Sequence, residues 1–86
     1  MAKTLFYERT LDVGGEYVAL KLFKASRGYA LERRIVEVDD AASVQILLIG
    51  SLEDLNRFEN ADPYRRQMTS LYSDIRRRLI NGGFAD

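Results

Sequence analysis

Apolar and polar side chains alternate through the first half of the chain, which is the pattern of half-buried β-strands. The alternation predicts strands over residues 5–13 and 17–23, separated by Gly14-Gly15, where a turn with positive φ costs little. A third strand is predicted over residues 29–38. Its apolar positions change parity along the strand, so we expect a β-bulge near Arg33-Arg34.

A fourth strand is predicted from the run that ends at Ile49. Val44, Ile46 and Leu48 occupy one parity, and Leu47 and Ile49 are apolar on the other. Strands that are apolar on both faces are typical of buried sheet positions. We therefore expect this strand to be central in the sheet or covered.

The second half of the chain has helical spacing. Ser51 is a good N-cap, with Asp54 three residues later as in a capping box. Asp62-Pro63 predicts the start of a second helix, because proline suits the first helical position. The apolar face of this helix then repeats every three or four residues: Tyr64, Met68, Leu71, Tyr72, Ile75 and Leu79. Asn81-Gly82-Gly83 ends it.

These elements predict an α+β fold, a four-stranded antiparallel meander followed by a short helix and a long amphipathic helix covering one face of the sheet. With 86 residues, a single domain over residues 1–86 is expected. A chain this small buries a modest share of its surface, and the second sheet face is left uncovered. We therefore expect a homodimer.

The composition argues against catalysis. The chain has no histidine and no cysteine, which removes the commonest general base and a thiolate metal site. The serines lack a histidine to activate them, and neither glycine pair has the pattern of a phosphate loop. We expect no enzyme activity, no cofactor and no bound metal. No run is long and apolar enough for a signal peptide or a membrane span, so a cytoplasmic location without membrane contact is expected.

Charge is segregated along the chain although the net charge is zero. Residues 21–34 and residues 64–80 each hold five basic residues and one acidic residue, whereas residues 37–62 hold one basic and seven acidic. The arginines of the second helix could contact phosphates, form a solvated face, or meet the acidic stretch of a second subunit. The acidic pairs Asp39-Asp40 and Glu53-Asp54 fit loop and cap positions better than a cation site.

The second and third strands combine rings and cations in a way that suits single-stranded nucleic acid. Such ligands bind surfaces that offer cations to phosphates and flat rings to unstacked bases. The candidate nucleic-acid-binding residues are Tyr17, Lys21, Phe23, Arg27, Tyr29 and Arg33. The alternative is that the rings fill a dimer interface and the cations are solvated edge residues.

Four segments carry a family resemblance: residues 11–13, 17–21, 27–31 and 35–38. Together they resemble the PUR-repeat family, whose β-β-β-β-α unit is related in plan to Whirly-like folds, over about residues 4–60. The resemblance implies a unit that is often dimeric and binds single-stranded nucleic acid on basic and aromatic strands. A different class of function, a homodimeric protein-interaction or regulatory module without a nucleic-acid role, remains open.

Overall fold

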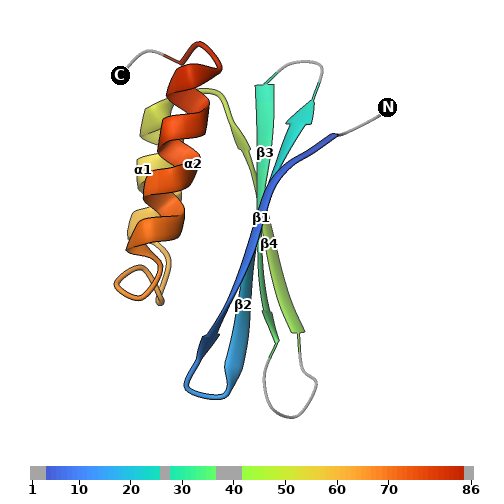
Figure 1. The fold of residues 1–86 in the computed structure, drawn as a ribbon, viewed down its shortest axis with the longest axis vertical. Helices are drawn as coiled ribbons and strands as arrows, with labels where there is room; N and C mark the ends of the chain where they lie inside the picture. Colours follow the sequence, from blue (N-terminus) through green and yellow to red (C-terminus); the bar gives the residue numbers. More distant parts are fainter. Residues whose placement is uncertain (1–3, 26–27, 37–41, 85–86) are drawn as a thin grey trace. The chain divides into compact units, whose positions relative to one another are not determined.

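The computed structural model describes residues 4–25, 28–36 and 42–84, and the chain divides into two compact units, Met1–Leu48 and Ile49–Asp86 (Figure 1). The first unit holds the strands and the second holds the helices. The element order is a four-stranded meander followed by two helices. This confirms the predicted α+β class.

The sheet is formed by β1 (Thr4–Val13), β2 (Glu16–Ala25), β3 (Gly28–Val36) and β4 (Ala42–Ile49), in the spatial order β1-β2-β3-β4. β1 and β2 pair antiparallel, as do β2 and β3. Consecutive strands are neighbours in space, so each connection is local.

The turn between β1 and β2 is the predicted one. Gly14 and Gly15 both have positive φ, 61° and 92°, and join Val13 directly to its partner Glu16. A two-residue turn with this backbone matches the twist of a hairpin. The N–H of Gly15 donates to Oδ1 of Asp12 at 3.2 Å, which adds a side-chain bond to the turn.

The β-bulge lies in a different strand from the one expected. Pairing of β2 with β3 is continuous from Tyr17 opposite Val36 to Ala25 opposite Gly28, so there is no bulge at Arg33-Arg34. The register shift is instead in β1, between Leu5 and Tyr7. The expected last residues of the third strand, 37 and 38, lie outside the described residues.

The prediction that the fourth strand is central or covered is wrong. β4 is the last strand in the sheet order, and every side chain described from Ser43 to Leu48 is exposed. Val44, Ile46, Leu47 and Leu48 are therefore exposed on an edge strand, and Ile49 at its end is buried.

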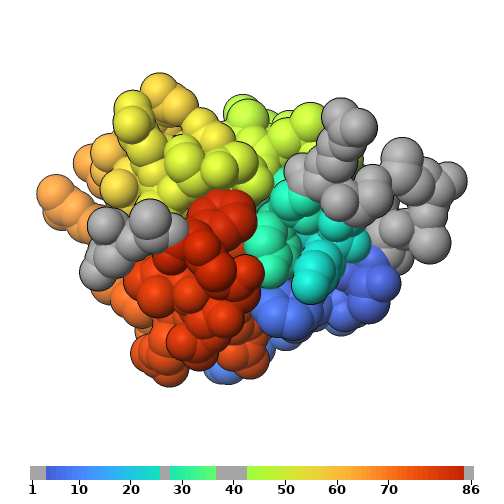
Figure 2. Space-filling view, turned by 90° about the horizontal axis from the view of Figure 1, so that it is seen from above, coloured from blue at the N-terminus to red at the C-terminus, as the bar shows by residue number. Residues whose placement is uncertain are grey.

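In the second unit, α1 (Leu52–Asn60) has the predicted cap. The N–H of Asp54 donates to Oγ of Ser51 at 3.3 Å, and Oδ2 of Asp54 accepts the N–H of Gly50 at 2.8 Å. The first bond satisfies an orphan donor of the first turn, and the second reaches back to the residue before the N-cap, one position earlier than in a standard capping box. Figure 2 shows α1, in yellow, lying against the red α2.

The second helix, α2 (Thr69–Asn81), begins six residues later than Pro63 predicts. Residues 63–68 form successive turns instead. Oδ1 of Asp62 accepts the N–H of Tyr64, two residues later, at 2.7 Å, which is the bond of an Asx-turn. α2 ends as predicted, with Gly82 as C-cap followed by Gly83 at φ 109°. No helix among the described residues has the length and apolarity needed to cross a membrane.

Candidate binding surface

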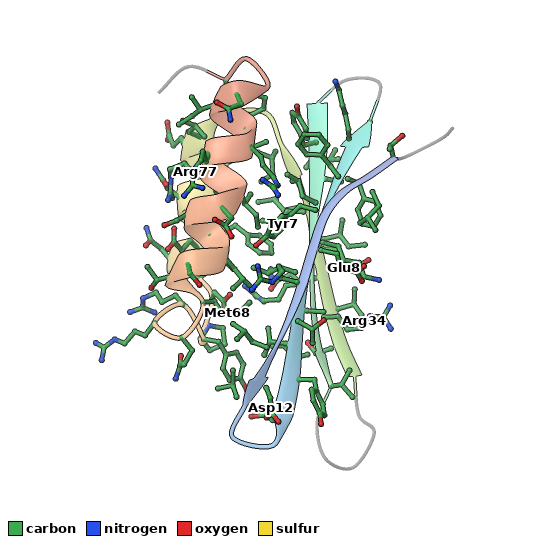
Figure 3. All side chains as sticks on the ribbon, in the orientation of Figure 1. Tyr7, Glu8, Asp12, Arg34, Met68 and Arg77 are labelled. Carbon is green, nitrogen blue, oxygen red and sulfur yellow. The ribbon has the colours of Figure 1, made fainter. Side chains whose placement is uncertain are left out.

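The register of the first three strands defines two faces of the sheet. Residues opposite each other in an antiparallel pair point to the same face. Glu8, Lys21 and Glu32 form one cross-strand row, so we name their side the Lys21 face. Arg9, Leu20 and Arg33 form a row on the other side, the Leu20 face. In Figure 3, Tyr7 and Glu8 point to opposite sides of β1, and Arg34 lies on the side of Glu8.

Three of the candidate nucleic-acid-binding residues share the Lys21 face. Tyr17, Lys21 and Phe23 alternate along β2 as the sequence predicts. Tyr17 is 53% exposed, and Lys21 and Phe23 are half-buried. These three side chains are therefore accessible on one surface.

Tyr29 and Arg33 do not join them. Ala25 lies opposite Gly28, so Tyr29 falls opposite Lys24 and Arg33 opposite Leu20, both on the Leu20 face. Each of the two is only 5% exposed. The prediction that they share one surface with Phe23 is wrong, because the pairing of Ala25 with Gly28 sets the register of the third strand and turns both side chains to the other face. Arg27 lies outside the described residues.

Tyr29 and Arg33 contact other residues of the sheet instead. The ring of Tyr29 lies 5.9 Å from that of Phe6, centroid to centroid, across β2. The guanidinium of Arg33 donates through Nη2 to Oε1 of Gln45 on β4. Arg33 thus links the third and fourth strands. A hydrogen bond between two strands could not be predicted from the sequence, because the register that brings the two residues together was unknown.

The Lys21 face carries little positive charge. Nζ of Lys21 lies 3.6 Å from Oε2 of Glu8, and Glu32 follows in the same row. Asp12 also belongs to this face, because it pairs with Tyr17. Against these acidic residues the described strands place only one further cation here, Arg34. Such a surface does not concentrate the positive potential that attracts phosphates.

The most conspicuous group on the sheet is apolar and lies on β4. Gln45 contacts Arg33, so its side chain is on the Leu20 face, and alternation places Val44, Ile46 and Leu48 on the Lys21 face. Their exposed fractions are 47%, 55% and 75%. We call these three residues the β4 strip. Sequence reasoning found the apolar run but assigned it to the core.

The arginines of α2 are largely engaged within the helical unit. Nη2 of Arg76 lies 2.9 Å from Oε1 of Glu59 and 2.7 Å from Oδ1 of Asn56, both on α1. Arg77 lies 3.7 Å from Asp74, on its own helix. Ion pairing within the chain is not one of the three roles considered for these arginines, and those three roles stay untested.

The acidic candidates also have local roles where they are described. Asp54 accepts the N–H of Gly50, and this hydrogen bond, with the neighbouring Arg57, holds the pKa of its carboxyl below the ordinary value. No group of three acidic side chains that could hold a metal ion is found in the part of the chain that the structure describes. Asp39-Asp40 lies outside that part.

Comparison of the chain with protein-family models, with curated proteins and with solved structures finds no match.

Proposed function

We propose that the chain is a non-enzymatic protein-interaction module that forms a homodimer through the β4 strip. The observation that carries the proposal is the exposure of Val44, Ile46 and Leu48, adjacent apolar side chains on one face of an edge strand. Isolated exposed apolar residues are ordinary, but a contiguous group on a small domain marks an interaction site. A cytoplasmic location is part of this proposal.

The electrostatics of the same face favour a protein partner over a polyanion. β4 contains no charged residue, and Lys21 is close to Glu8. Interfaces between proteins have an apolar, charge-depleted centre with charged residues outside it. The β4 strip, with the charged row of Glu8, Lys21 and Glu32 elsewhere on the same face, has this composition.

Sedimentation equilibrium tests the proposal. We expect a mass near twice the 9.9 kDa of the chain at micromolar concentration, with little change at high salt. Apolar contacts depend weakly on ionic strength, whereas ion pairs between exposed charges are screened. A mass that stays near 9.9 kDa across the concentration range would overturn the proposal.

Single-stranded nucleic-acid binding is the second candidate, as the PUR-repeat resemblance implies. The observation that favours it is the common face of Tyr17, Lys21 and Phe23, with Arg34 beside them. Tyr17 and Phe23 could each stack on a base, with about 1–3 kcal/mol per base. With few cations on the face, the affinity would be near micromolar at low salt.

Fluorescence anisotropy with a labelled single strand separates the two candidates. Lys21→Ala should weaken binding more than Lys24→Ala, its matched control, because Lys24 is exposed on the opposite face of the same strand. Absence of binding by the wild type at low salt would remove this candidate and leave the interaction module.

The hydrophobic pattern predicts that the second helix covers one face of the sheet and that the chain is a single domain, and both stay predictions. The support is that both apolar sets are fully buried. Val18, Leu20 and Leu22 of the sheet are inaccessible to solvent, as are Met68, Ile75 and Leu79 of the helical unit. A helix with one apolar stripe and a sheet with one apolar face are the usual partners in α+β domains.

A further inference from the structure

The two edges of the sheet differ in how they are protected. β1 carries Glu8, Arg9 and Asp12 and has a bulge between Leu5 and Tyr7. Charged residues and bulges are the devices by which edge strands avoid pairing with other chains. β4 has neither a charge, a proline nor a glycine between Ala42 and Ile49. The second edge is therefore open to a further strand, and the first is not.

We propose that the strand which pairs with β4 is β4 of a second copy of this chain, antiparallel to it, with Ile46 on the two-fold axis. The inference rests on the proposed homodimer and specifies its geometry. The two sheets would join edge to edge into one continuous sheet, and the backbone groups along the outer edge of β4 would be hydrogen-bonded across the dimer.

The register follows from matching exposed apolar residues. With Ile46 opposite its own copy, Val44 lies opposite Leu48. All three residues of the β4 strip then have apolar cross-strand partners. A shift of the axis to Gln45 would place Leu48 opposite Ala42 and lose one such pair. Because β4 is uncharged, self-pairing brings no like charges together, as an isologous interface requires.

A second copy fits this edge better than a charged ligand does. Nucleic acid would find no cation on β4, and a charged peptide would find no residue of opposite sign there. The edge of β4 is complementary to another uncharged, apolar strand, and β4 of a second copy is such a strand. The occupant is therefore defined by the chain's own sequence.

The absence of cysteine from the chain permits a clean test by single-cysteine cross-linking. Opposite residues of an antiparallel pair have Cα atoms about 4.5–5.5 Å apart, within the range of a disulfide. On a denaturing, non-reducing gel, Ile46→Cys should therefore shift from the mass of one chain to that of two after mild oxidation. Val44→Cys alone should not, because its copy lies four residues away along the strand, about 13 Å.

Two further reactions fix the register. An equimolar mixture of Val44→Cys and Leu48→Cys should cross-link, although neither variant does so alone. Ser73→Cys, exposed on α2, is the control for random collision and should remain a single chain.

The cross-linking outcomes separate this inference from the proposed homodimer. If the wild type sediments as a dimer but Ile46→Cys does not cross-link, the edge geometry is wrong and the homodimer stands. Cross-linking of Val44→Cys alone would overturn the register. A monomeric wild type would overturn both proposals.

Discussion

The hydroxyl group of Tyr72 donates a hydrogen bond to Oδ2 of Asp62, and both side chains are completely buried. The other carboxyl oxygen accepts the backbone N–H of Tyr64 at 2.7 Å. Asp62 thus joins the turns that follow α1 to the first turn of α2. A buried acid is costly unless it is hydrogen-bonded, so this side chain organises the connection between the helices.

Tyr72→Phe should destabilise the protein by about 1–3 kcal/mol, because it removes a donor from a buried acceptor. Chemical denaturation measures the change in free energy of unfolding. Tyr17→Phe is the matched control, since Tyr17 is 53% exposed and its loss of a hydroxyl should change stability by less than about 0.5 kcal/mol. Equal effects of the two substitutions would contradict the structural role of the buried pair.

The start of α2 shows why sequence reasoning failed at this point. Asp62-Pro63 has the composition of a helix N-terminus, and the sequence predicts a helix from there. The Asp62 side chain instead bonds the N–H of Tyr64 and the hydroxyl of Tyr72. The second bond spans ten residues, so a local pattern carries no signal for it.

Arg76→Ala should cost about 1 kcal/mol, because Arg76 bonds Glu59 and Asn56 of α1 from α2. Arg77→Ala is the control, because Arg77 is 68% exposed and contacts Asp74 on its own helix. Thermal denaturation of both variants measures the difference. A change in stability as large for Arg77→Ala as for Arg76→Ala would show that the interhelical bonds contribute nothing specific.

Asp54 should make the stability of the helical unit depend on pH in acid. The N–H of Gly50 and the Arg57 side chain lower the pKa of Asp54 from its ordinary value of 3.8. The ionised Asp54 carboxyl therefore contributes fully to the free energy of unfolding above pH 3.8. This contribution is lost as the pH falls through the lower pKa of the folded state. Asp54→Asn should be less stable than wild type at neutral pH, and the difference should shrink as the pH falls below 3.8. A difference that is constant with pH would contradict this role.

Strand pairing is the part of the fold that the sequence predicts best. Alternation in β2 and the Gly14-Gly15 turn are local features, and both are confirmed. The face predicted for Tyr29 was wrong, because a shift of one residue in strand register moves every side chain of the strand to the other face. That register is set at the turn between Ala25 and Gly28, where the sequence does not specify how many residues form the loop.

The position of β4 was wrong for a different reason. A strand that is apolar on both faces can be buried between layers or can be an exposed edge strand. Both kinds of strand have the same pattern of apolar residues in the sequence. The absence of charge between Ala42 and Ile49 fits both. Only the strand order, with β4 at the end, distinguishes them.

Leu71→Ala should cost about 2–5 kcal/mol, because Leu71 is buried on α2. The double variant Leu71→Ala with Leu20→Ala tests whether α2 covers the Leu20 face. If it does, the double variant should lose an amount of unfolding free energy that differs from the sum of the two single losses by more than about 0.5 kcal/mol. The unfolding free energies of the wild type and three variants give this coupling. Simple additivity would contradict direct packing of the helix on that face.

Ile46→Lys should convert the homodimer into a folded monomer. In the proposed register the two introduced ammonium groups face each other across the axis, and like charges directly opposite in a sheet are destabilising. Ile46 is 55% exposed within one chain, so a lysine can reach solvent once the copies separate. The substitution therefore acts on association and spares the fold.

Thr10→Lys is the matched control for this substitution. Thr10 is exposed on the Lys21 face of β1, the opposite edge strand, so the variant adds the same charge to the same face away from the proposed contact. Sedimentation equilibrium should give a mass near 9.9 kDa for Ile46→Lys and near twice that for Thr10→Lys, with circular dichroism unchanged in both. If Ile46→Lys remains dimeric, the contact lies elsewhere. If both variants dissociate, general repulsion between charged copies, and not the β4 edge, controls assembly.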